Sequence, residues 1–146
     1  MTGLPIDAAA CNALLRAVLN KPWAPRAPGP AAFDCYTLLQ HADRVLFGRT
    51  LPDYPAGITA SSPKAVRRHL LASPFYRALK RVSEPAHGDY VALCIGPRRL
   101  PAHVGIWLAV NRMGGVLHCE HGRGVTFDEP AILKATSYDI DCYRPA

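Results

Sequence analysis

The chain lacks any long hydrophobic run. No apolar stretch approaches the ~18 residues that a membrane-spanning helix needs, so we expect no membrane partner. Ala8-Ala9-Ala10-Cys11 resembles a lipoprotein cleavage box, but the residues before Cys11 contain no Lys or Arg and no apolar core. Because a signal peptide requires both features, we expect none and predict that the protein is made in the cytoplasm.

Paired cysteine motifs are also missing. The five cysteines are widely scattered and include no CxxC pair. This pattern argues against a disulfide framework and a zinc ribbon, and it suits a reducing compartment. The cysteines are Cys11, Cys35, Cys94, Cys119 and Cys142.

Length and composition favour one globular domain. The chain has 146 residues, of which 49% are hydrophobic and 19% charged, as in a folded protein rather than a disordered one. Nine of the 14 prolines lie in three segments that we interpret as loops, Lys21–Pro30, Pro52–Pro63 and Pro97–Pro101. With no internal repeat and no long linker, residues 1–146 are predicted to form a single domain.

Acidic residues are fewer than basic ones, and the net charge is +6. An excess of basic residues can indicate that a protein binds nucleic acid or an anionic polymer such as a cell wall, or it can serve only solubility. Many basic residues lie between Lys64 and Arg81, where a helix could turn Ala65, Val66 and Leu70 inward and the charges outward. We interpret this segment as a solvated face and predict no nucleic-acid partner, because no binding motif accompanies it.

Apolar spacing predicts helices in the first half of the chain. Asp7 and Asp34 are candidate N-caps, Pro63 suits a first helical turn, and Gly48 suits a helix end. The predicted helices run over Asp7–Asn20, Asp34–Phe47, Ser62–Leu71 and Phe75–Val82.

The second half of the chain changes to strand-like patterns. The predicted strands are Asp89–Ile95, His103–Val110, Val116–Glu120 and Tyr138–Tyr143, with a short helix capped by Asp128-Glu129-Pro130 and ending near Lys134. Helices that precede an antiparallel sheet indicate an α+β domain.

Cys35 is the cysteine best placed for chemistry. It follows the candidate cap Asp34, so it would lie at the positive end of a helix, where a thiolate is stabilised. The thiolate is the nucleophilic form of cysteine. The alternative is a small core residue, which is how we interpret Cys11, Cys94 and Cys142.

Two later histidines could act with this thiol. His103 begins an apolar strand and shares one face with Gly105 and Trp107, which leaves room for a substrate. His118 could orient the His103 ring as the third member of a triad. His41, His69 and His87 are predicted to be surface residues.

Four motifs, taken together and in order, resemble the NlpC/P60 family of papain-like cysteine peptidases. They are Phe33-Asp34-Cys35, Gly88-Asp89-Tyr90-Val91, His103-Val104-Gly105-Ile106-Trp107-Leu108 and Val116-Leu117-His118. The resemblance covers Trp23 to Val125. Gly48-Arg49-Thr50-Leu51-Pro52-Asp53-Tyr54 is similar to a segment common in the phage-tail branch of that family.

The resemblance implies an α+β papain-like fold in which a helix carrying Cys35 packs on an antiparallel sheet. It further implies Cys35 as nucleophile, His103 as general base and His118 as orienter, with no metal or other cofactor. The implied activity is cleavage of peptide bonds in peptidoglycan stem peptides. Phage tail proteins would be further partners, and a virion tail a second location after synthesis in the bacterial cytoplasm.

Three residues near the cysteine are predicted to bind substrate: Trp23, Asp34 and Tyr36. Trp23 stands where the family commonly has a tyrosine, and an indole N–H can also donate a hydrogen bond. Tyr36 replaces a serine or tryptophan that usually follows the cysteine.

The third triad member depends on the register of one hairpin. A turn closing symmetrically around Asn111–Gly115 would leave His118 on the order of 17 Å from His103 along the strand. The triad therefore requires a turn near Ala109–Arg112 or a bulge at Gly114-Gly115. A turn centred on Arg112 would instead place His121 opposite His103, as the third member of the triad.

Other functions remain open at this point. A catalytically silent tail-assembly module would keep the fold as a binding surface, and a nucleic-acid binder would use the Lys64–Arg81 segment. A zinc site built from Cys94, His103, His118, Cys119 and His121 is disfavoured, because alternation points His118 and Cys119 to opposite faces of their strand.

Overall fold

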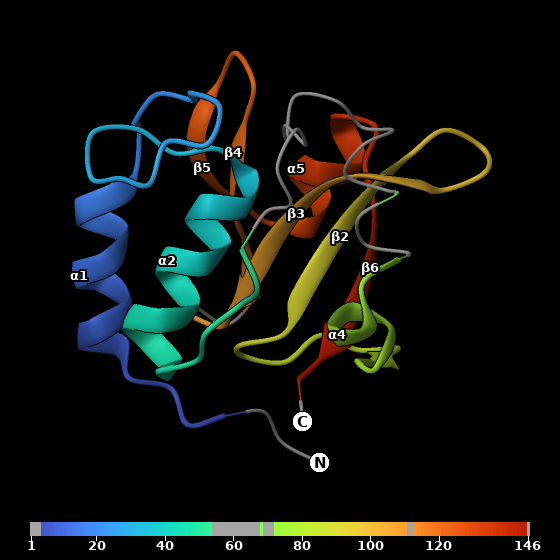
Figure 1. The fold of residues 1–146 in the computed structure, drawn as a ribbon, viewed down its shortest axis with the longest axis horizontal. Helices are drawn as coiled ribbons and strands as arrows, with labels where there is room; N and C mark the ends of the chain where they lie inside the picture. The colour runs from blue at the N-terminus through green and yellow to red at the C-terminus, as the bar shows by residue number, and fades with distance from the viewer. Residues whose placement is uncertain (1–3, 54–67, 69–71, 111–112, 146) are drawn as a thin grey trace.

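A six-stranded antiparallel sheet forms the centre of the molecule in a computed structural model that describes residues 4–53, 68, 72–110 and 113–145. The strand order is β1-β6-β2-β3-β4-β5, which Figure 1 shows from one side. The strands are β1 (Lys80–Val82), β2 (Tyr90–Ile95), β3 (Leu100–Leu108), β4 (Gly115–Glu120), β5 (Gly124–Asp128) and β6 (Asp139–Arg144). Helices precede the sheet, so the predicted α+β class is confirmed.

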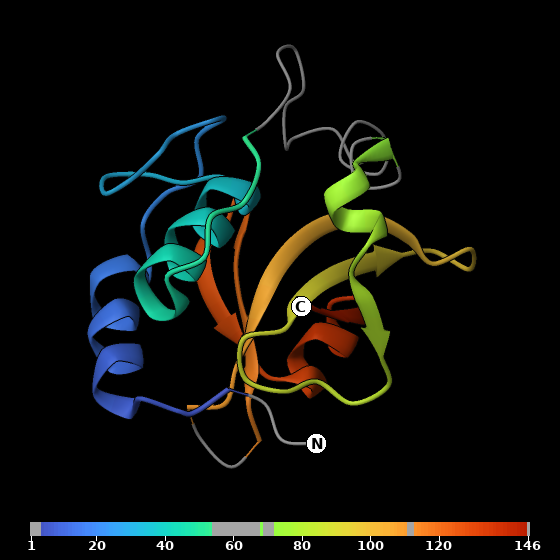
Figure 2. The ribbon, with the colours of Figure 1, turned by 60° about the horizontal axis from the view of Figure 1, so that its bottom comes forward.

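Helices cover both faces of this sheet. The helices are α1 (Ala8–Val18), α2 (Cys35–Phe47), α4 (Pro74–Arg77) and α5 (Pro130–Ala135). Helices α1 and α2 lie side by side on one face, and α5 lies against the other (Figures 1 and 2). The predicted Ser62–Leu71 helix falls almost wholly outside the described residues.

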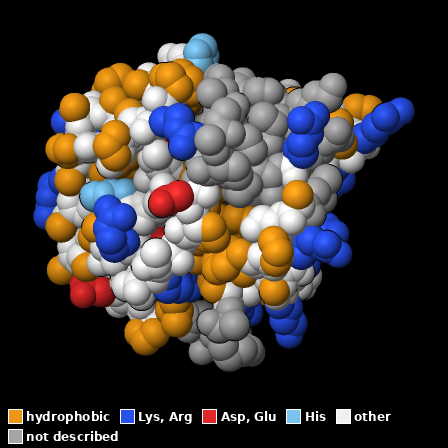
Figure 3. Space-filling view, in the orientation of Figure 1, with side chains coloured by type: hydrophobic (Ala, Val, Ile, Leu, Met, Phe, Trp, Pro, Cys, Tyr) orange, Lys and Arg blue, Asp and Glu red, His pale blue; other side chains and the backbone are white. Residues whose placement is uncertain are grey.

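Charged side chains do not gather on the face shown in Figure 3. The Lys and Arg side chains there are scattered among hydrophobic and uncharged ones. Residues 64–67 and 69–71 of the basic Lys64–Arg81 segment lie outside the described residues. Within the described ranges, no helix has the length and apolar character to cross a membrane.

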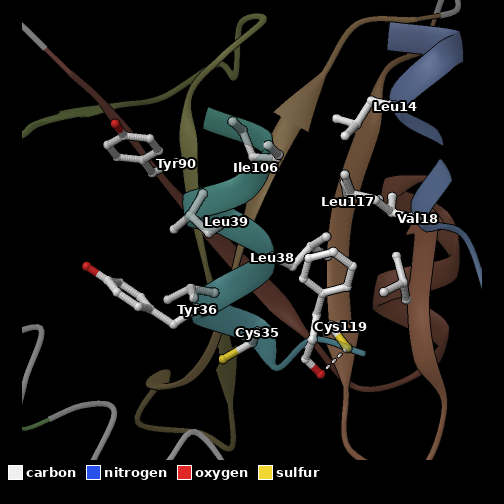
Figure 4. Packing of buried hydrophobic residues seen from close by; sticks show 14 of the residues in the cluster. Leu14, Val18, Cys35, Tyr36, Leu38, Leu39, Tyr90, Ile106, Leu117 and Cys119 are labelled. Carbon is white, nitrogen blue, oxygen red and sulfur yellow. Dashed lines mark hydrogen bonds between the residues drawn. The ribbon is translucent and has the colours of Figure 1, made fainter. Parts of the chain in front are cut away.

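The core has two parts because side chains alternate along the strands. Ile106 and Leu117 face the helices and pack with Leu38 and Leu39 of α2 (Figure 4). Side chains of the opposite face, including Trp107 and Val116, pack with Leu133 of α5.

Local capping explains where the two long helices begin and end. The Asp7 carboxylate accepts a hydrogen bond from Ala10 N, as predicted for an N-cap. Gly48 ends α2 in the left-handed conformation, with φ at 64°. These caps depend only on neighbouring residues, which is why the sequence pattern located them.

Two predicted elements were wrong in type or extent. Phe75–Val82 is not one helix, because α4 ends at Arg77 and Lys80–Val82 pairs with Cys142–Arg144 of β6. Pairing with a distant strand overrides the local helical pattern here. Strand β3 begins at Leu100 rather than His103, and β5 was not predicted.

His87 was predicted on the surface, but the structure buries it. Its exposed fraction is 5%, and its Nδ1 accepts a hydrogen bond from Ala109 N at the end of β3. Its Nε2 lies 3.8 Å from Cys11 Sγ. The ring therefore links helix α1 to the end of β3.

Candidate active site

Cys35 occupies the first position of helix α2, as the sequence predicted. The Asp34 carboxylate caps the helix by accepting hydrogen bonds from Tyr36 N at 3.0 Å and Thr37 N at 2.9 Å. Thr37 Oγ1 returns the contact by accepting from Asp34 N at 2.8 Å, which completes a capping box. The dipole of α2 thus places its positive end at the Cys35 thiol, where it favours a thiolate.

A hydrogen bond joins the two histidines. His103 Nε2 lies 2.7 Å from His118 Nδ1, and both rings are buried. Strand pairing places Gly105 directly opposite His118, so His103 is its diagonal neighbour on the same face. Without a Cβ at Gly105, the strands approach closely; an added Cβ would lie 2.6 Å from Val116 Cγ1.

The hairpin turn decides which histidine is the partner. Leu108 pairs with Gly115 and Gly105 with His118, so the register is neither the symmetric one nor the one expected from a turn over Ala109–Arg112, and His103 reaches His118 diagonally. A bulge also precedes His103, because Leu93 pairs with His103 while Cys94 pairs with Pro101. The ring of the alternative residue, His121, packs edge-on against Trp23 with centroids 4.4 Å apart.

The histidine pair continues to a carboxylate that the sequence reasoning missed. His118 Nε2 lies 2.9 Å from Asp128 Oδ2 at the end of β5. Asp128 also accepts hydrogen bonds from Thr126 Oγ1 at 3.1 Å and from Arg123 Nη1 at 3.3 Å. Strand β5 itself was not predicted, so no local signal connected Asp128 with His118.

Burial and these contacts set the protonation of the site. Burial lowers the pKa of His103 well below its usual value, and the charges of His118 and Arg123 lower it further. The imidazole of His103 is therefore neutral at pH 7 and able to accept a proton. The hydrogen bond from His118 holds the pKa of Asp128 at about 2, so this carboxylate is ionised.

Tyr138 closes the site on the α5 side. Its ring stacks on His103 with centroids 6.0 Å apart, and its hydroxyl donates to Glu120 Oε1 at 2.6 Å. Burial and Glu120 raise the pKa of Tyr138, and the charge of a Cys35 thiolate raises it further. His103 of β3 is thus a direct neighbour of this tyrosine.

Helix α2, which begins with Cys35, contacts strand β3, which carries His103. The exposed fraction is 1% for Cys35 and 6% for His103. Within the described part of the chain, the hydrogen bond of the His103 ring runs to His118, so Nδ1 is the nitrogen left to face a thiol or a substrate. A substrate must displace neighbouring atoms to reach either group.

Each of the three predicted substrate-binding residues contacts other parts of the protein. The Asp34 side chain is fully buried, and its carboxylate also accepts from Arg26 N at 2.7 Å, which ties the preceding loop to the start of α2. The Tyr36 hydroxyl accepts from Tyr76 and donates to the Pro52 carbonyl. Trp23 is half-buried beside His121.

The five residues of the disfavoured zinc site do not all converge, although His103 and His118 meet. Cys119 Sγ donates to the Phe33 carbonyl oxygen on the α2 face (Figure 4), while His118 points to the opposite face. Among the residues that the structure describes, no group of three or more His, Cys, Asp or Glu is arranged to hold a metal ion.

Comparison with solved structures finds a similar fold in the NlpC/p60 domain of the peptidoglycan hydrolase SagA. The two structures share a TM-score of 0.55 over 94% of this chain and 98% of that chain, with 18% sequence identity. No protein-family model matches the sequence. No curated protein sequence matches it significantly either. The chain therefore has the papain-like α+β fold of an NlpC/p60 domain.

Proposed function

We propose that the protein is a thiol hydrolase of the NlpC/P60 type that cleaves peptide bonds in peptidoglycan stem peptides. The observation that carries this proposal is the 2.7 Å hydrogen bond between His103 and His118, in a fold whose helix α2 begins with Cys35. The fold shared with a peptidoglycan hydrolase domain supports the choice of substrate. The segment from Gly48 to Tyr54 suggests that the protein acts together with phage tail proteins.

The first half of the reaction forms a thioester. His103 Nδ1 accepts the Cys35 proton, and the thiolate attacks the scissile carbonyl carbon. The backbone N–H of Cys35 and the loop before it stabilise the oxyanion. The imidazolium then gives its proton to the departing amine as the C–N bond breaks.

The second half regenerates the enzyme. Neutral His103 takes a proton from water, and the resulting hydroxide attacks the thioester carbon. The C–S bond breaks, the peptide leaves with a new carboxyl group, and the sulfur regains the proton from His103. His118 keeps the His103 ring oriented in both halves.

Digestion of purified peptidoglycan tests this proposal. Wild-type protein should release muropeptides, and Cys35→Ala should release none. Cys142→Ala is a matched control, since it removes a buried thiol from the opposite core cluster and should retain activity. Equal profiles for wild type and Cys35→Ala would contradict the proposal for this substrate.

A catalytically silent binding module is the second candidate, and the near-complete burial of Cys35 favours it. Alkylation of Cys35 as a function of pH separates the two candidates. A reactive thiolate should be modified well below pH ~8.5, the ordinary thiol value, whereas a silent module should follow that value or resist modification.

A further inference from the structure

A continuous line of hydrogen bonds runs from the candidate base to the edge strand β5. His103 Nε2 contacts His118 Nδ1 at 2.7 Å, and His118 Nε2 contacts Asp128 Oδ2 at 2.9 Å. The His118 side chain is completely buried, and Asp128 is 6% exposed. The two imidazoles are therefore shielded from water that could supply alternative partners.

The last member of this line has a fixed polarity. An ionised carboxylate can only accept hydrogen bonds, whereas each neutral imidazole has one donor and one acceptor nitrogen. Thr126 and Arg123 also donate to Asp128, which favours its ionised form. The proton of the shared bond must then reside on His118 Nε2.

The direction of this hydrogen bond fixes which nitrogen is protonated in both rings. With its proton on Nε2, His118 presents Nδ1 as an acceptor, so the bond to His103 requires a proton on His103 Nε2. The other nitrogen of His103, Nδ1, then carries a lone pair. In the opposite arrangement, Nδ1 would carry the proton and could not accept one from a thiol.

We propose that Asp128 is a positioning residue that sets the tautomer of His103 through His118. This inference rests on the proposed function for its catalytic consequence, but the tautomer itself exists without substrate. It extends a Cys-His-His arrangement by a fourth residue, which acts two hydrogen bonds away from the base. Asp128 does not touch the reacting atoms.

Other charged groups surround the line and have to be considered with it. Arg123 contacts Asp128 and Glu120 from the β4–β5 turn, and the Tyr138 hydroxyl donates to Glu120. Of these groups, Arg123 contacts the carboxylate directly, so its loss should weaken the effect of Asp128 without reversing the polarity.

Nitrogen-15 NMR of the histidine rings in the substrate-free protein tests the proposal. In wild type we expect the Nε2–H tautomer for both His103 and His118. In Asp128→Asn, the amide can donate to His118 Nε2, so both rings should change to the Nδ1–H tautomer. A His118 ring protonated on both nitrogens near neutral pH would overturn the proposal, because its Nδ1 would then be a donor.

Activity supplies the second readout. If the carboxylate sets the tautomer, kcat of Asp128→Asn should fall by ~10²–10⁴-fold with little change in KM, as for a wrong-tautomer triad. Thr126→Val removes a bond to the same carboxylate but keeps its charge, so it should retain the wild-type tautomers and most activity. Asp141→Asn is a control for losing an ion-paired carboxylate on β6.

The two proposals fail in different ways. A folded Asp128→Asn protein with unchanged tautomers would overturn the role of Asp128, even if wild type digests peptidoglycan. An inactive wild type with the expected tautomers would contradict only the peptidase function. If Asp128→Asn fails to fold, the tautomers of the wild-type protein test the role of Asp128 by themselves. A proton on Nδ1 of His103 would overturn the proposal.

Discussion

Burial makes His103 a base, whereas the hydrogen bond from His118 makes Asp128 a source of stability. At the scale of single residues, a low exposed fraction removes the water that would otherwise solvate a charge. For His103 this favours the neutral imidazole. For Asp128 the hydrogen bond from His118 outweighs burial, so the charged form is favoured instead.

The pKa of Asp128 predicts a pH-dependent contribution to folding. Its pKa falls from the usual 3.8 to about 2 in the folded protein, so the folded state favours the ionised form. That contribution is about 2 kcal/mol. It is complete above the unfolded pKa and is lost as the pH falls through the folded value.

Urea unfolding of wild type and Asp128→Asn between about pH 5 and pH 2 checks this contribution. The difference in free energy of unfolding between the two proteins should be largest near pH 5 and should shrink as acid is added. A difference that stays constant over this range would contradict the pKa shift.

At the scale of elements, the beginning of α2 depends on one buried carboxylate. Asp34 accepts from three backbone N–H groups, those of Arg26, Tyr36 and Thr37. Asp34→Ala leaves these donors without their partner, so we expect a loss of about 2–4 kcal/mol. Thermal or urea unfolding measures the loss.

The cap of α1 provides the matched control for this prediction. Asp7 is exposed and accepts from Ala10 N alone, so Asp7→Ala should cost about 1 kcal/mol or less. Equal losses for the two variants would show that burial of the α2 cap has no energetic effect.

The close approach of β3 and β4 gives a second element-scale prediction. A Cβ on Gly105 would lie 2.6 Å from Val116 Cγ1 and 2.8 Å from the Leu117 carbonyl oxygen. Gly105→Ala should therefore cost about 1–3 kcal/mol of stability. It should also lower activity, because His118 lies directly opposite on β4.

A double variant separates the two contacts. Val116→Ala in the Gly105→Ala background removes the methyl contact but leaves the carbonyl, so stability relative to Val116→Ala alone should recover in part. Full wild-type stability of the single Gly105→Ala variant would mean that the strands can move apart without cost.

At the scale of the whole molecule, two buried histidines predict acid sensitivity. Burial lowers the pKa of both His87 and His103, and Arg49 lowers that of His87 further. The unfolded chain binds these protons near the usual pKa of 6.5, while the folded protein does not. Stability should therefore be complete above about pH 6.5 and fall below it, by up to ~1.4 kcal/mol per pH unit for each histidine.

Urea unfolding from about pH 8 to pH 5 measures this slope. His87→Gln should reduce the slope without altering the histidine pair, because His87 lies near α1 and the end of β3. An unchanged slope in that variant would exclude His87 as a source of the acid sensitivity.

Local interactions determined what the sequence predicted correctly. Asp7, Asp34 and Gly48 act within one helical turn, so their caps could be recognised without a fold. The same holds for the position of Cys35 at the start of α2 and for the alternation that puts His103 and Gly105 on one face. Strand β5 carried too weak a pattern between its turns to be recognised.

Only the tertiary structure decided which distant groups meet. The register of one hairpin selected His118 and left His121 beside Trp23. Strand β5, which pairs with β4, brought Asp128 to the pair. Pairing with β6 turned Lys80–Val82 into a strand, and packing buried His87. The sequence by itself determined the candidate nucleophile and base, because a helix cap and a strand face are local; hydrogen bonds across strands require the completed sheet.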